Sequence, residues 1–155
     1  ITSSFKSSQW HNIFILETKA DLLYSNGYLN ESLLFYEIVL EQNPNNLYAI
    51  KRMFDIDFAL IKKNNKKNSK KVFNRYSNLL EQINSIEIIN KFLILAQNSN
   101  LTNWQEYLLN EKKFYNQEIT KKVYIQNMKQ IKRESKVSKL ISLIKHKIII
   151  INENI

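Results

Sequence analysis

The sequence has almost none of the residues that let a backbone turn sharply. Its 155 residues include one glycine, Gly27, and one proline, Pro44, where an average composition would supply roughly a dozen glycines and about eight prolines. Glycine-rich phosphate loops, nucleophile elbows and dinucleotide fingerprints need glycines at fixed positions. The chain can form none of these sites, so we expect a protein that is not an enzyme, binds no cofactor and takes no small-molecule substrate.

Metal-ligating and acid–base residues are also scarce. Cysteine is absent, which excludes disulfides, thiol nucleophiles and cysteine-ligated zinc. His11 and His146 lie far apart and belong to no spaced ligand motif, so we expect no metal site. Asp55 and Asp57 stand two positions apart, which on a helix separates them by about 200°. We expect both at the surface or at the edge of an apolar stripe.

Long apolar runs are missing as well. No run of about 18 or more apolar residues occurs, so the sequence predicts no transmembrane helix. The chain begins with Ile1 rather than methionine, which is typical of a processed product or a fragment. We expect residues 1–12 to form an N-terminal extension outside the fold.

The formal net charge of +9 is unevenly distributed along the chain. Residues 1–60 carry four basic and seven acidic side chains, and residues 61–155 carry nineteen and seven. This asymmetry favours an anionic partner for the C-terminal part, either RNA, a membrane surface or an acidic protein face. The other interpretation is that AT-rich codon usage placed solvated lysines there.

Apolar residues recur at steps of three and four over most of the chain, which is typical of amphipathic helices. The sequence therefore predicts an all-α fold of antiparallel helix hairpins. The first helix is expected over 13–24. The second is expected to begin with Asn30 as its N-cap and to end before the turn at Pro44. Further helices are expected over 47–62, 71–83, 86–98, 102–114, 117–131 and 135–148.

Two segments are expected to depart from this pattern. Residues 62–71 read KKNNKKNSKK, a like-charged stretch that predicts a solvated loop or a disordered insert. The β-branched run from Ile148 to Ile151 could form a short strand instead of continuing a helix.

Residues 13–46 resemble one tetratricopeptide (TPR) unit. The small residues Ala20 and Ser32 stand where the two helices of the unit would approach each other, and Gly27 stands at the turn between them. Tyr36 and Val39 occupy positions on the second helix, and Pro44 closes the repeat. Residues 47–83 resemble a second, degraded unit that the lysine-rich insert lengthens. The resemblance implies stacked hairpins over residues 13–98, followed by a basic helical region over 99–155.

Within the TPR superfamily, the stretch from Tyr36 to Leu60 is similar to subunit 2 of the endoplasmic reticulum membrane protein complex. That family places a Lys-Arg pair after its Asn-Pro turn, as Lys51-Arg52 does here. The resemblance implies a noncatalytic cytoplasmic scaffold, peripheral on the cytosolic face of that membrane, which holds protein subunits of an insertase together. It implies that Lys51, Arg52 and the neighbouring Tyr48 contact partner proteins.

A second resemblance begins at Trp104. Trp104, Tyr107 and Glu111 reproduce the Trp-x-x-Tyr-x-x-x-Glu spacing of half-a-TPR (HAT) repeats from RNA-processing factors. It implies an adaptor in a ribonucleoprotein complex, with Trp104 and Tyr107 as partner contacts. A divergent helical subunit of an organellar complex is a third alternative.

The basic C-terminal region supplies the candidates for an anionic partner. If they gather on one helix face, these residues could follow phosphates or an acidic protein surface. They are Lys121, Lys122, Lys129, Lys132 and Arg133.

Overall fold

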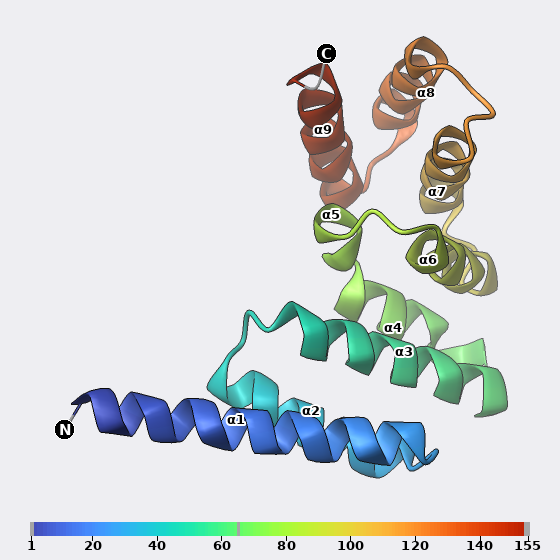
Figure 1. Ribbon diagram of the computed structural model, residues 1–155. Coiled ribbons are helices and arrows are strands. Elements are labelled where there is room, and N and C mark those ends of the chain that lie inside the picture. The colour runs from blue at the N-terminus through green and yellow to red at the C-terminus, as the bar shows by residue number, and fades with distance from the viewer. Residues whose placement is uncertain (1, 65, 154–155) are drawn as a thin grey trace. The chain divides into compact units, whose positions relative to one another are not determined.

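The computed structural model describes the backbone of residues 2–64 and 66–153, and the side chains of residues 12–61 and 66–153. Within these ranges the chain is α-helical apart from one short 3-10 helix and the turns, and it has no strand (Figure 1). The predicted all-α fold is confirmed. The chain divides into two compact units, Ile1–Asn64 and Asn65–Ile155, which are described separately.

The first unit is a helix hairpin followed by a third helix. Its helices are α1 (Thr2–Ser25), α2 (Leu29–Gln42) and α3 (Leu47–Asn64). The hairpin turns at Gly27, whose φ of 83° suits glycine because it has no β-carbon. The Gly27 and Tyr28 amides donate to the carbonyls of Tyr24 and Leu23 at 3.1 and 2.9 Å, which satisfies the end of α1 as a Schellman motif does.

Small residues let α1 and α2 approach each other. Ala20 and Ser32 are both fully buried, and the Ser32 hydroxyl donates to the Ala20 carbonyl at 2.8 Å. Tyr36 and Val39 are also fully buried. These positions were chosen from the sequence as contact positions, and all four lie in the core.

Two helices of the first unit begin earlier than expected. The helix α1 begins at Thr2 rather than at residue 13, since no glycine or proline interrupts residues 2–12; the N-terminal extension over 1–12 stays a prediction. Asn30 is not an N-cap, because α2 begins at Leu29 and Tyr28 occupies the cap position without a side-chain hydrogen bond.

The lysine-rich stretch 62–71 is not the predicted loop. The helix α3 continues through Asn64, a 3-10 helix covers Lys66–Asn68, and α4 begins at Ser69; residue 65 lies outside the described residues. Lysine is a good helix former, and Ser69 anchors the segment because it is fully buried. Asn98 donates to the Ser69 hydroxyl oxygen at 3.2 Å.

The second unit consists of consecutive helices that pack against their neighbours. Their bounds are α4 (Ser69–Tyr76), α5 (Leu79–Gln82), α6 (Ile86–Asn98), α7 (Thr102–Tyr115), α8 (Lys121–Glu134) and α9 (Ser138–Glu153). The helix expected over 71–83 is interrupted between α4 and α5. The boundary expected near residue 98 lies inside this unit, where α6 packs against α7.

The alternative of a short strand at the end of the chain is wrong. The helix α9 includes Ile148 and Ile151 and ends at Glu153, and residues 154 and 155 lie outside the described part. Leu140 and Ile144 are fully buried on this helix. Ile148 and Ile151 follow Ile144 at four and seven positions, so the isoleucine run continues the same helical stripe.

Candidate functional site

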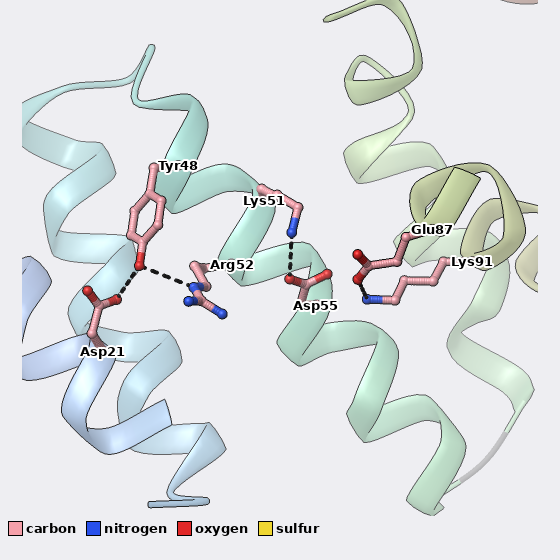
Figure 2. Close-up of polar contacts among 7 residues, drawn as sticks. All are labelled: Asp21, Tyr48, Lys51, Arg52, Asp55, Glu87 and Lys91. Carbon is pink, nitrogen blue, oxygen red and sulfur yellow. Dashed lines mark hydrogen bonds and ion pairs between the residues drawn. The ribbon is translucent and has the colours of Figure 1, made fainter. Parts of the chain in front are cut away.

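An arginine on α3 lies over two tyrosine rings in the first unit; Figure 2 shows one of them, Tyr48, beside Arg52 and Asp21. The Arg52 guanidinium is 4.6 Å from the ring centroid of Tyr24 and 5.4 Å from that of Tyr48. Its Nε donates to the Tyr48 hydroxyl at 3.3 Å, and that hydroxyl donates to Asp21 at 2.8 Å. We call the two rings the Arg52 shelf; they fix the position of a charged side chain that is only half-buried.

Asp21 connects this shelf to the core of the unit. It also accepts a hydrogen bond from Tyr36, whose side chain is fully buried. Burial and the Asp21 carboxylate raise the pKa of Tyr36, so its hydroxyl remains a donor. The hydrogen bond to Tyr48 raises the pKa of Arg52. The cluster therefore combines one anchored carboxylate with one fixed cation.

Lys51 occupies a different face of α3 from Arg52. Its Nζ lies 3.4 Å from Asp55 one turn later (Figure 2), the i,i+4 spacing that favours such pairs. Asp55 is only 7% exposed, so the expectation of a surface residue is wrong. Asp57 is half-buried, in agreement with a position at the edge of the stripe. On α6, Glu87 and Lys91 form a similar pair at 3.0 Å.

Trp104 and Tyr107 are core residues of the second unit. They are 5% and 1% exposed and contact each other edge-to-face, with ring centroids 5.9 Å apart. Trp104 also packs edge-to-face on Phe73 at 4.9 Å, and Phe73 on Phe92 at 5.3 Å. As arranged, neither Trp104 nor Tyr107 is accessible to a partner.

A buried polar network connects α7 to α8. The Tyr124 hydroxyl donates to Glu111 at 2.6 Å, and Asn110 donates to the Tyr124 carbonyl at 3.1 Å. Asn127 in turn donates to Asn110 at 2.8 Å. Sequence reasoning missed this network, although Asn110 and Glu111 follow the core residue Tyr107 by three and four positions. In this unit the Trp-Tyr-Glu spacing therefore serves packing.

The five basic candidates gather on one face of α8. With about 100° between successive residues, they occupy an arc of about 120° that contains no acidic residue. Lys122, Lys129 and Arg133 are exposed, and Lys121 and Lys132 are half-buried. The buried residues Tyr124, Met128 and Ile131 form a stripe beside this face, next to the half-buried Lys121 and Lys132. We call the five basic residues the α8 basic face.

In the described part of the chain, His146 belongs to no group of potential metal ligands. His146 Nε2 lies 3.7 Å from a carboxylate oxygen of Glu81, and the side chain of His11 lies outside the described residues. The described residues contain no group of three potential ligands. None of the described helices is both long enough and apolar enough to cross a bilayer.

No protein-family model, curated protein or solved structure matches this chain. Function is therefore inferred from the chemistry of the residues described above.

Proposed function

We propose that this protein is a noncatalytic helical scaffold of the TPR kind, which binds other protein subunits of a larger assembly. The Arg52 shelf carries this proposal. A half-buried arginine held over Tyr24 and Tyr48 has already lost much of the side-chain freedom that binding would remove. Arginine and tyrosine are also enriched among the residues that dominate binding energy at protein interfaces.

The chemistry of Arg52 defines the partner group. Nε is held by Tyr48, whereas the two terminal nitrogens form no hydrogen bond with any residue in the described part of the chain. A planar guanidinium whose two terminal nitrogens are available as donors can bind a carboxylate through two parallel hydrogen bonds. We infer that an acidic side chain or a chain terminus of the partner binds there, beside the 44%-exposed ring of Tyr48.

The hairpin of the first unit supports the wider assignment. Ala20 and Ser32 allow the close approach of α1 and α2, and Gly27 ends α1, which are the features of a TPR unit found in the sequence. With the Lys51-Arg52 pair after the Asn-Pro turn, they favour the scaffold of the endoplasmic reticulum insertase. On this proposal the protein is cytoplasmic and peripheral to that membrane.

The test is affinity purification of the tagged full chain from gently detergent-solubilised cells, with mass spectrometry of proteins retained after a salt wash. We expect the wild type to retain insertase subunits and Arg52→Glu to lose most of them. Arg75→Glu is the matched control, because Arg75 also lies over a tyrosine ring, 5.3 Å from Tyr76, on another helix. Circular dichroism checks that both variants are folded.

Two results would contradict the proposal. If Arg52→Glu retains every subunit that the wild type retains, the Arg52 shelf is not the contact. If the wild type instead recovers RNA-processing proteins in an RNase-sensitive manner, the insertase assignment fails and the HAT-type adaptor replaces it. Recovery of organellar subunits would support the third alternative.

A further inference from the structure

We propose that the α8 basic face binds the phosphate backbone of a nucleic acid. This surface belongs to the second unit and is independent of the Arg52 shelf. Its residues are Lys121, Lys122, Lys129, Lys132 and Arg133. The proposal requires that these charges share one surface, are accessible, and lack internal counter-charges.

The register of α8 places the charges on one rigid surface. The helix has 14 residues and is therefore about 21 Å long. Thr120 fixes its start, because its hydroxyl oxygen accepts a hydrogen bond from the Val123 amide at 3.2 Å. The one other residue of α8 on the same arc is Ile125, so a polyanion meets five cations and no repelling carboxylate.

No carboxylate of the described residues neutralises the five cations. None of them forms an ion pair with a described residue; Arg133 donates only to the backbone carbonyl of Lys129, at 3.3 Å. On α3 and α6, by contrast, lysines pair with acids one turn away. The α8 basic face is thus a concentrated positive charge with its counter-ions in solution, whose release drives binding to phosphates.

The arrangement also works against the stability of α8. Lys129 faces the like charges of Lys132 and Arg133 at i+3 and i+4, which repel one another. Lys121 and Lys122 stand in the first turn, where the helix dipole disfavours cations. A bound polyanion would reduce both the repulsion between the cations and their unfavourable interaction with the helix dipole, so binding should stabilise the second unit.

A nucleic acid fits this surface better than a membrane does. A helix that lies in a membrane interface presents an apolar face to the lipid beside its basic residues. Three apolar residues of α8 are already buried: Tyr124, Met128 and Ile131 are 2%, 0% and 6% exposed. Val123 is 38% exposed, but it lies outside the basic arc, and within that arc the one apolar residue is the half-buried Ile125. A single half-buried isoleucine is not an apolar face, so the surface suits sequence-independent contact with phosphates rather than insertion.

The experiment uses the full chain with the four substitutions Lys122→Gln, Lys129→Gln, Lys132→Gln and Arg133→Gln. Glutamine keeps the helix propensity of lysine and removes the repulsion, so we expect this variant to unfold at the same urea concentration as the wild type or a higher one. The control replaces four exposed lysines outside α8: Lys66, Lys67, Lys70 and Lys71.

Binding is measured by fluorescence anisotropy with a labelled 20-nucleotide oligouridylate between 50 and 300 mM salt. For a single strand, the slope of log K against log salt is about −0.7 per phosphate contacted. We expect the magnitude of the slope to fall by about 3 in the α8 variant and to stay within about 1 of wild type in the control. The oligonucleotide should also raise the unfolding temperature of the wild type but not that of the α8 variant.

Three outcomes would overturn the proposal. The first is an equal loss of binding in the two variants, because binding would then depend on the net charge of the chain and not on the α8 basic face. The second is absence of binding at 50 mM salt. The third is binding to vesicles of phosphatidylcholine with 30% phosphatidylserine in the absence of binding to the oligonucleotide, which would assign the face to a membrane. None of these results depends on whether Arg52 binds a protein.

Discussion

The hydroxyl of Ser32 donates a hydrogen bond to the backbone carbonyl of Ala20, and both residues are fully buried between α1 and α2. A serine at this position satisfies a carbonyl on the neighbouring helix and occupies little volume. The two helices can therefore pack with their backbones close together. This contact explains why small residues stand at positions 20 and 32.

Ser32→Val should destabilise the first unit. The larger side chain overpacks a fully buried position, and the hydrogen bond from the Ser32 hydroxyl to the Ala20 carbonyl is lost, so we expect the free energy of unfolding to fall by about 2 kcal/mol. Urea unfolding followed by circular dichroism measures this change. Ser25→Val is the control, because Ser25 is exposed at the end of α1; an equal loss in the two variants would contradict the prediction.

Asp21→Ala should cost about 2 kcal/mol, because Tyr36 then has a buried hydroxyl without its acceptor. Adding Tyr36→Phe removes the unpaired hydroxyl and should recover part of the loss. The double-mutant cycle is measured by urea unfolding. Strictly additive losses for the two substitutions would show that the carboxylate and the hydroxyl are not coupled.

Gln117→Gly should stabilise the second unit. Gln117 has a φ of 59°, and its amide donates to the Phe114 carbonyl at 3.0 Å, so it occupies the left-handed position after α7. Glycine adopts this conformation without the strain of a β-carbon. We expect a gain of about 0.5–1 kcal/mol, read as an increase in the urea midpoint. The reciprocal change, Gly27→Ala at a φ of 83°, should lower the urea midpoint of the first unit.

Stability should fall at alkaline pH because of buried tyrosines. Burial, with the nearby Glu111 carboxylate, raises the pKa of Tyr124 and of Tyr107 above the ordinary value of 10.0. Above pH 10 the unfolded chain releases these protons and the folded chain keeps them, so their contribution, complete below that pH, is lost as pH rises. Each tyrosine should contribute a slope of about −1.4 kcal/mol per pH unit.

The substitution Tyr124→Phe isolates one of these slopes. Below pH 10 it lowers stability by about 1 kcal/mol, because the hydrogen bond to Glu111 is lost. Above pH 10 its stability should decline less steeply than that of the wild type. Urea unfolding at intervals between pH 8 and 11.5 measures both curves. Parallel curves above pH 10 would show that Tyr124 does not hold its proton in the folded state.

Local patterns predicted much of the fold because their causes are local. The spacing of apolar residues predicted the helix over 86–98 with the bounds that the structure has. Gly27 predicted the end of α1, because a left-handed residue needs no knowledge of the rest of the chain. The same local reasoning failed at 62–71, where composition suggested a loop. There the buried contact between Ser69 and Asn98, 29 positions apart, helps to hold the helix.

The accessibility and the contacts of the candidate site residues could be learned only from the tertiary structure. Lys51 and Arg52 are adjacent in sequence, yet one pairs with the buried Asp55 and the other lies over Tyr24 of a different helix. Trp104 and Tyr107 were candidates for contact with a partner, and they are buried.

The sequence by itself determined the helical class, the helix hairpin and the positive charge of the C-terminal part, because composition and periodicity act within a few residues. Only the tertiary structure decided which of these side chains are accessible. Burial and the partner of a charge depend on which helices pack together, and residues far apart in the chain set that packing.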